Sequence, residues 1–271
     1  MKFSMKHLIF CLLLISNLNA FAQTVTQLDK DLDHAAYLVN YDRREAAFSE
    51  LNGFIKKHPS NHRAYYLRAI NYYKDGNTKS ALEDINYALK YRYNSADYHK
   101  LKGEILALSQ KYKSSAESFE TALRFCDTAF ANYYFAAKSY YLAEEFQRAE
   151  NNMKKFLEHH PENDSAKYLY AEILASNNNQ IDALKIVNSM QQKGADFYRL
   201  RGIVYCKSEM YEYSLKDLNT ALDLNPKLTD IYLWRGLAYY FSNKRDLAKA
   251  DWQTALKYRH FKANNYLEKY R

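Results

Sequence analysis

Residues that interrupt helices are scarce in this chain. It contains only 3 prolines and 6 glycines among 271 residues, and proline in particular breaks a helix interior. Apolar residues nevertheless make up 48% of the sequence, a share that supports a sizeable core. Tyrosine, with 27 residues, is in clear excess. This balance favours a helical protein with few interruptions.

The usual motifs of enzymes and metal sites are missing as well. The sequence has no G-x-S-x-G, H-E-x-x-H, phosphate-loop or C-x-x-C pattern. His58 and His62 are four residues apart, but Pro59 breaks the helix that would align them. His159 and His160 are adjacent and project in different directions. We therefore predict no catalytic residue, no metal, no cofactor and no enzymatic activity.

The N-terminus has the pattern of a secretory signal peptide. Lysines precede a short apolar stretch, Leu8 to Ile15, and a small-x-small tripeptide ends at Ala22. We expect residues 1–22 to be removed, with cleavage between Ala22 and Gln23, and a linker over 23–27. The mature protein would then be exported, to the periplasm or the outside of a bacterial cell. An uncleaved anchor is the alternative, although the stretch is shorter than the ~20 apolar residues of a membrane span.

The charge balance is moderately basic. The formal net charge is +8, and removal of the two lysines in residues 1–22 would leave 37 basic and 31 acidic residues. This excess is too small to indicate a nucleic-acid partner, and export argues against one too. A basic surface could attract acidic polymers or anionic membranes, but an ordinary solvated helical surface explains the charge more simply.

A period of 34 residues runs through the rest of the chain. It is marked by two columns of small residues, twelve positions apart, with a single step of 31 residues in each column. The first column is Ala35, Ala69, Gly103, Ala137, Ala171, Gly202 and Gly236. The second column is Ala47, Ala81, Ser115, Ala149, Ala183, Ser214 and Ala248. Small residues at both places allow two helices to approach closely.

The stretch from Ala195 to Leu228 shows the complete unit. Its key positions are Tyr198, Gly202, Tyr205, Leu218, Ala221 and Pro226. This pattern resembles the tetratricopeptide repeat (TPR), a helix-turn-helix unit of 34 residues. The resemblance implies an all-α fold, a right-handed α-solenoid of about seven repeats. A single hairpin cannot bury its apolar face, so neighbouring hairpins must stack.

The register divides residues 28–262 into seven units, followed by a short tail. The predicted units are 28–61, 62–95, 96–129, 130–163, 164–194, 195–228 and 229–262. The tail, 263–271, is polar and basic, and we expect it to form a solvated last turn or two. The fifth unit is three residues short, and we expect the loss to lie between helices, near Met190 to Gly194. The short unit is a candidate place for the array to divide, with units 1–5 on one side and units 6 and 7 on the other. A tolerated deletion explains the missing residues more simply.

An arginine and an aspartate occur together in three units. Arginine precedes the small residue of the first column, and aspartate follows that arginine by sixteen residues. The pairs are Arg68 with Asp84, Arg201 with Asp217, and Arg235 with Asp251. Units without the arginine lack the aspartate. We predict a structural ion pair between the two helices of each of these hairpins.

The two cysteines that remain after cleavage should not form a disulfide. Cys126 belongs to the third unit and Cys206 to the sixth. Helix spacings place them roughly 20–30 Å apart, whereas a disulfide needs Cα atoms within about 7 Å. We predict two free thiols.

The TPR resemblance also implies a binding surface. In proteins of this family the first helix of each hairpin lines a concave groove that holds extended peptides or partner helices. Tyrosine at such positions suits recognition, but packing between neighbouring units is an equally good explanation for each residue. The expected groove residues are Tyr66, Ile70, Tyr73, Lys100, Glu104, Tyr134, Lys138, Tyr141, Tyr168, Glu172, Arg199, Ile203, Leu233, Leu237 and Tyr240.

The family's carboxylate clamp for chaperone C-termini is not present. Its lysine and asparagine positions are mostly tyrosine, leucine, isoleucine or phenylalanine here. The resemblance implies a non-enzymatic scaffold or adaptor that binds a protein partner, with cell-envelope or secretion-related assembly as the expected setting. The alternative is an accessory subunit that recognises a glycan or presents a catalytic partner. Self-association through the C-terminal end is also possible.

Overall fold

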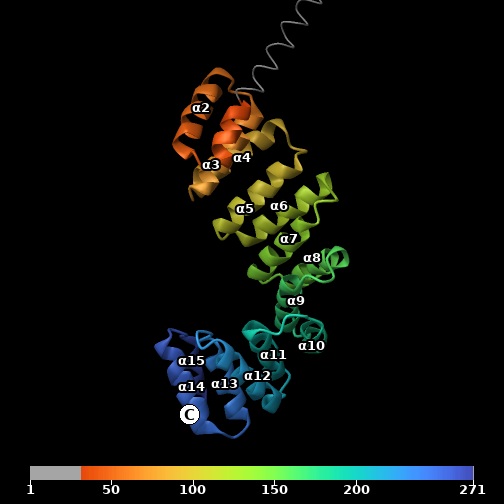
Figure 1. The fold of residues 1–271 in the computed structure, drawn as a ribbon, viewed down its shortest axis with the longest axis vertical. Coiled ribbons are helices and arrows are strands. Elements are labelled where there is room, and N and C mark those ends of the chain that lie inside the picture. Colours follow the sequence, from red (N-terminus) through yellow and green to blue (C-terminus); the bar gives the residue numbers. More distant parts are fainter. Residues whose placement is uncertain (1–31, 271) are drawn as a thin grey trace, which may run out of the picture. The chain divides into compact units, whose positions relative to one another are not determined.

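A computed structural model describes residues 32–270, and all regular structure in this range is helical (Figure 1). The predicted signal peptide, its cleavage site at Ala22–Gln23 and the linker 23–27 lie outside the described residues. Residues 32–40 are helical. The helices that follow are α2 (Arg44–Lys57), α3 (His62–Lys74), α4 (Thr78–Tyr91), α5 (Ala96–Leu108), α6 (Tyr112–Phe125), α7 (Ala131–Leu142), α8 (Phe146–His159), α9 (Asp164–Ser176), α10 (Gln180–Asn188), α11 (Ala195–Lys207), α12 (Tyr211–Leu224), α13 (Ile231–Phe241), α14 (Arg245–Lys257) and α15 (Lys262–Lys269).

The chain forms two compact units, which divide between Asp127 and Thr128. In the first unit, α3 pairs with α4 and α5 with α6. In the second unit, α7 pairs with α8, α9 with α10, α11 with α12, and α13 with α14. The suggested division near Met190 to Gly194 is wrong, because this segment lies inside the second unit, where α10 packs against α11.

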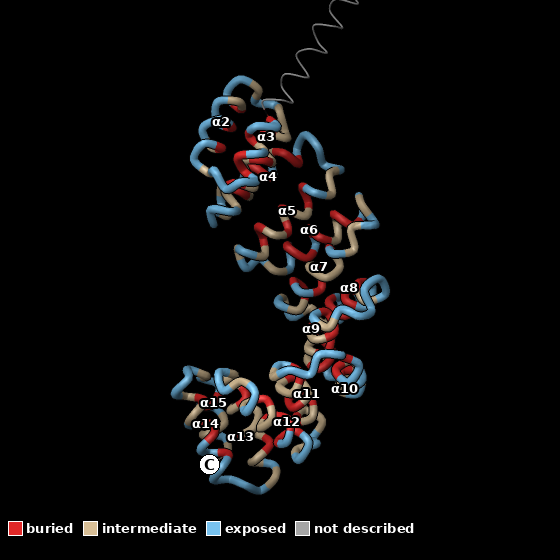
Figure 2. Tube along the Cα trace, viewed as in Figure 1, coloured by how far each residue is buried: buried red, intermediate tan, exposed pale blue. Residues whose placement is uncertain are grey.

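Each hairpin is held together by one large residue that faces the first column of small residues. This large residue lies sixteen positions after the small one, on the second helix, and is at most 2% exposed. Figure 2 shows that buried segments recur along the helices of both units. The column consists of Leu51, Ile85, Phe119, Met153, Val187, Leu218 and Trp252. In two hairpins a serine of the second small column adds a hydrogen bond: Ser115 Oγ donates to the Gly103 carbonyl and Ser214 Oγ to the Gly202 carbonyl, both at 2.8 Å.

The turn inside each hairpin repeats one conformation. Its second residue is left-handed, with φ between 58° and 76°. These residues are Asp42, Gly76, Gln110, Glu144, Asn178, Glu209 and Asn243. The next backbone N–H donates to the carbonyl five residues earlier, at 2.8–2.9 Å in every hairpin, which closes the first helix. Gly76 is the single glycine among these seven residues.

The three residues missing from the fifth unit are lost from a helix. Helix α10 spans 9 residues, whereas the second helices of the other hairpins span 13 or 14. The connection to α11, residues 189–194, is longer than the one from α8 to α9, residues 160–163. The prediction that the loss lies between helices is therefore wrong.

The C-terminal tail is a packed helix, contrary to the expectation of a solvated turn. On α15, Ala263 is fully buried. The rings of Tyr266 and Tyr270 lie 5.6 and 5.7 Å from the Trp252 ring. Alanine and tyrosine at these helical spacings form one apolar face that covers α14. Self-association through this end stays a prediction. The apolar face of α15, however, is already packed against α14 within the same chain.

The three arginines lie against their aspartates, and each ion pair has the same geometry. In each pair Nε and Nη2 of the arginine donate to the two carboxylate oxygens, at 2.6–3.0 Å. The aspartate side chains are only 5–9% exposed and the arginine side chains 18–23%. Such bidentate, shielded pairs are stronger than an exposed ion pair.

The same arginines also join neighbouring hairpins. Nη1 donates to an asparagine of the preceding hairpin, and this acceptor is Asn52 for Arg68, Asn188 for Arg201 and Asn219 for Arg235. Tyrosines three residues before and four residues after each arginine have ring centroids 5.3–5.9 Å from the guanidinium. This distance suits a cation–π contact. The repeat register predicts the aspartate partner but neither the asparagine nor the tyrosine pair.

The close approach of helices predicts opposite effects for two glycine-to-alanine substitutions. A Cβ at Gly202 would lie 2.7 Å from Leu218 side-chain carbons, whereas a Cβ at Gly53 in α2 would meet nothing within 4 Å. We expect Gly202→Ala to destabilise the protein by about 1–3 kcal/mol through overpacking. Gly53→Ala should stabilise it by about 0.5–1 kcal/mol through helix propensity. Urea unfolding followed by circular dichroism measures both, and an unchanged midpoint for Gly202→Ala contradicts the packing account.

The shielded ion pair between Arg201 and Asp217 predicts a graded series of stability losses for three alanine substitutions. Asp217→Ala leaves a half-buried guanidinium without its carboxylate, so we expect a loss of about 2–3 kcal/mol. Asn188→Ala removes one hydrogen bond to Arg201 and should cost about 1 kcal/mol. Asp223→Ala, at an exposed position of α12, should change stability by less than about 0.5 kcal/mol. Urea unfolding tests the order, and equal effects for Asp217→Ala and Asp223→Ala would exclude a stabilising pair.

Candidate partner-binding face

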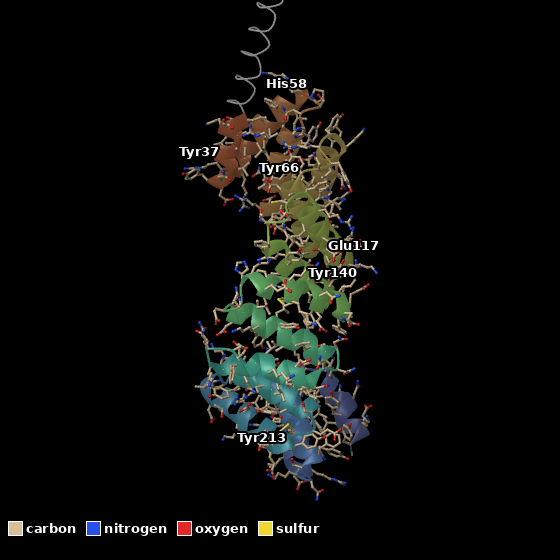
Figure 3. All side chains as sticks on the ribbon, turned by 90° about the vertical axis from the view of Figure 1, so that its right-hand side faces the viewer. Tyr37, His58, Tyr66, Glu117, Tyr140 and Tyr213 are labelled. Carbon is tan, nitrogen blue, oxygen red and sulfur yellow. The ribbon has the colours of Figure 1, made fainter. Side chains whose placement is uncertain are left out.

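In the first unit, the expected groove residues lie on α3 and α5 and are partly packed together. The ring of Tyr66 stacks on Tyr98 at 4.5 Å (Tyr66 is labelled in Figure 3). Ile70 packs against the buried clusters on both sides of α3. Lys100 forms an ion pair with Glu104 on the next turn, at 3.9 Å. Tyr73 is half-buried beside Glu104. This face therefore offers tyrosine rings and one paired lysine.

In the second unit, the expected residues differ widely in accessibility. Lys138 on α7 is exposed, and Tyr134 and Leu237 are partly exposed. Ile203 is only 9% exposed and belongs to a buried cluster with Leu218. The Tyr240 ring lies 4.4 Å from Tyr270. Ile203 and Tyr240 thus contribute mainly to packing within the unit.

The most concentrated group of polar side chains surrounds Arg199 on α11. Its Nη1 donates to Asp230 at 2.5 Å, and its Nη2 donates to the hydroxyl of Tyr168 on α9. Glu172 and Asp196 lie 3.8 and 3.7 Å from guanidinium nitrogens. We call these five residues the Arg199 cluster. The cluster links the first helices of three successive hairpins, α9, α11 and α13. It reaches α13 at its N-terminal end, through Asp230.

A pocket of about 470 Å³ opens beside the Arg199 cluster. Its lining includes Tyr168, Asp196 and Arg199 of the cluster, together with Asp164 and residues of the α10–α11 connection. Asp164 Oδ2 accepts the backbone N–H groups of Gln191 and Gln192, at 2.9 and 2.8 Å. This carboxylate therefore holds the connection against the start of α9.

Burial dominates the electrostatics of the cluster. It raises the pKa of the Tyr168 hydroxyl, with a further contribution from Glu172. Burial also raises the pKa of the Glu172 carboxyl, although Arg199 opposes the effect. Burial lowers the pKa of the Arg199 guanidinium, but Tyr168, Asp230 and Glu172 outweigh it and the net shift is upward. Arg199 thus stays charged, and Tyr168 stays neutral well above its ordinary range.

Two neighbouring side chains complete the polar face of the second unit. Burial raises the pKa of Tyr141 on α7, which lies near Glu172. Lys207 on α11 donates to the Ala175 carbonyl at 2.9 Å. Lys74 in the first unit makes the equivalent contact with the Val39 carbonyl at 2.7 Å. Lys207 is therefore a link between hairpins that recurs along the chain.

Only part of this cluster was predicted from the sequence. Tyr168, Glu172 and Arg199 were expected groove residues, and they lie together. Asp196 and Asp230 were missed, although each lies within one helical turn of an expected groove position, at Arg199 and Leu233. The repeat register was the available signal: Tyr168 and Arg199 each lie three residues before the small residue of the first column, and Asp196 and Asp230 each lie six residues before it.

Within residues 32–270, no group of three or more His, Cys, Asp or Glu side chains has the arrangement of a metal site. Cys126 and Cys206 are both free thiols. None of the helices in the described range combines the length and the apolar character that crossing a bilayer requires.

The buried tyrosines predict an alkaline transition. Burial raises the pKa of Tyr66 to about 12, compared with about 10 in an unfolded chain. The stability that this raised pKa contributes is complete below about pH 10 and is lost as the pH rises through about 12. Tyr66→Phe should therefore lose less stability over this range, as measured by urea unfolding at stepped pH. Tyr213→Phe, which changes a 58% exposed ring, is the control. Equal losses in the wild type and Tyr66→Phe would refute the assignment.

Comparisons with known proteins agree with this architecture. A family profile described as tetratricopeptide repeat matches residues 66–130 and 135–196, and one described as TPR repeat matches residues 202–241. No curated protein sequence matches the chain. A tetratricopeptide repeat protein from Parabacteroides merdae has 15% identity and a TM-score of 0.65, over 89% of this chain and 97% of that one.

Two other solved structures are similar in fold. YrrB, described as a TPR protein with an unusual peptide-binding site, has 17% identity and a TM-score of 0.51, over 69% of this chain and 99% of that one. PilF of Pseudomonas aeruginosa has 15% identity and a TM-score of 0.58, over 75% of this chain and 96% of that one. The repeating hairpins, the two small-residue columns and the matching profiles together show that this chain is a TPR α-solenoid and belongs to the tetratricopeptide repeat family.

Proposed function

We propose that this protein is a non-enzymatic adaptor that holds an extended segment of a protein partner. The TPR fold generally mediates protein–protein interaction, and TPR proteins are generally scaffolds without catalysis of their own. The partner segment would lie along the first helices of the second unit, α7, α9, α11 and α13. The observation that carries this proposal is the Arg199 cluster with its adjoining pocket.

Three properties of this face support recognition of a peptide. It combines accessible aromatic rings, at Tyr134 and Tyr141, with polar groups that are preorganised by Arg199. A pocket of about 470 Å³ is within the usual range for binding sites of small ligands and side chains. Charged groups in such half-buried positions favour specificity, because an ill-matched partner leaves them unpaired.

We further propose that the protein acts outside the cytoplasm, in assembly of the cell envelope or of a secretion system. The support is the N-terminal pattern of lysines, a short apolar stretch and the tripeptide ending at Ala22.

Site-specific photocrosslinking in the cells that produce the protein tests both proposals. A photoreactive residue at Tyr134 or Tyr168 on the first-helix face should trap one or two recurrent proteins from envelope fractions. The same residue at Tyr213, 58% exposed on α12, is the control position. Mass spectrometry of the recovered chain should find Gln23 at its N-terminus.

Three results would refute these proposals, two for the partner site and one for export. Equal trapping from Tyr168 and Tyr213, or no trapped protein from either groove position, would exclude the first-helix face as the partner site. In the second case a polysaccharide panel becomes the next test, because tyrosine rings also stack on sugars. A chain that retains residues 1–22 and is recovered from the cytoplasm would exclude export.

A further inference from the structure

The pocket beside the Arg199 cluster lies at the irregular unit of the array. It is lined by the connection from the short helix α10 to α11, including Met190, Gln192 and Gly194. No other hairpin within residues 32–270 has a second helix as short as α10. The deviation from the 34-residue period therefore coincides with the pocket.

Hydrogen-bond acceptors are in surplus around this pocket. The carboxylate of Asp196 lies beyond hydrogen-bond distance of Arg199, at 3.7 Å. Glu172 lies 3.8 Å from Arg199 and accepts a hydrogen bond from Tyr168 instead. Asp164 Oδ1 is buried and has no hydrogen-bond partner. On the donor side, Arg199 already uses Nη1 and Nη2 on Asp230 and Tyr168, which leaves Nε. An incoming group that donates hydrogen bonds would satisfy these acceptors, whereas an incoming carboxylate would compete with Asp230.

Acidic side chains outnumber basic ones around the pocket. The carboxylates come from α9, α11 and the residue before α13, and they are Asp164, Glu172, Asp196 and Asp230. The cations are Lys167, which lies 3.9 Å from Asp164, Arg199, and Lys193 in the α10–α11 connection. Four carboxylates thus face three cations in a chain whose total charge is positive. The local charge is the reverse of the chain's overall charge.

The walls of the pocket provide an apolar surface next to these carboxylates. Met190 and Phe197 both line it. Lysine and arginine carry an aliphatic stem below a charged head, and they pack the stem on apolar surface while the head reaches polar groups. A basic side chain matches the pocket in charge, in hydrogen-bond donors and in this amphipathic shape.

We propose that this pocket receives a lysine or arginine side chain of the partner segment. The inference rests on the proposed function, since it names the chemistry of the segment that the first-helix face holds. Asp196 is the key contact for the charged head, because its carboxylate is 70% exposed and not hydrogen-bonded to Arg199. Asp164 and Arg199 position the walls of the pocket.

Nuclear magnetic resonance titration of the full-length, ¹⁵N-labelled chain tests this proposal. The probes are four capped pentapeptides, with arginine, lysine, citrulline or glutamate between two pairs of alanines. Citrulline has nearly the shape of arginine without its charge. We expect the arginine and lysine peptides to shift the backbone amides of residues 164–168 and 195–199. The citrulline and glutamate peptides should bind about tenfold more weakly or not at all.

A matched pair of variants locates the effect. Asp196→Asn should weaken binding of the arginine peptide about threefold to tenfold, whereas Asp223→Asn removes the same charge from an exposed position of α12 and should leave it unchanged. Both sites are exposed, so the unperturbed resonances report that each variant is folded. Equal binding of the arginine and citrulline peptides, equal effects of the two variants, or shifts away from both amide groups would overturn the proposal.

The outcome can be separated from that of the proposed function. Suppose that photocrosslinking traps a partner from Tyr168 but the pentapeptides show no preference. This result overturns the proposal that the pocket receives a basic side chain and leaves the adaptor function standing. A clear preference for the arginine and lysine peptides without any trapped partner overturns the adaptor function and supports the chemistry of the pocket.

Discussion

Each hairpin of this protein depends on one close approach between its two helices. A small residue on the first helix faces a large buried residue sixteen positions later. The sizes are complementary: glycine faces Phe119, Leu218 and Trp252, whereas the other hairpins place alanine opposite leucine, isoleucine, methionine or valine. A Cβ added at Gly202 would lie only 2.7 Å from Leu218 carbons. Because interiors are close-packed, this contact sets how far apart the two helices lie and how the next hairpin can stack on them.

Polar contacts then connect one hairpin to the next. In three hairpins an arginine binds the aspartate of its own hairpin and an asparagine of the preceding one. The fourth hairpin keeps the two tyrosines but has Ala136 in place of the arginine. There the cations come from α8, with Arg148 4.4 Å from the Tyr140 ring and Lys155 5.4 Å from the Tyr133 ring. The aromatic pair thus keeps a cationic neighbour even where the arginine is absent.

The polar character of the candidate partner-binding face arises where the repeat is least regular. Regular hairpins of the first unit present Tyr66 and Ile70, which are largely engaged in packing. The short helix α10 and its connection instead leave a pocket beside Arg199, Tyr168 and Asp196. Buried charge in this position is costly unless it is paired. Its pairing with Asp230 also holds α11 against the start of α13, so one cluster both links two helices and borders the pocket.

The sequence by itself determined the repeat, because packing demands a small residue at a fixed place in every hairpin and a period of 34 residues displays that demand directly. It also determined the partners of Arg68, Arg201 and Arg235 within each hairpin, since the two helices of a unit keep a constant register. Contacts between hairpins were decided by the tertiary structure. The pairing of Arg201 with Asn188 depends on where the shortened helix α10 loses its residues. The pairing of Arg199 with Asp230 depends on how α11 stacks against the start of α13. The C-terminal helix was misjudged for the same reason: its polar composition indicated a solvated tail, while three residues at helical spacing were enough to cover Trp252. The 34-residue period predicts the contacts that recur in every unit. Contacts that occur only once can be identified only when the arrangement of the units in space is known.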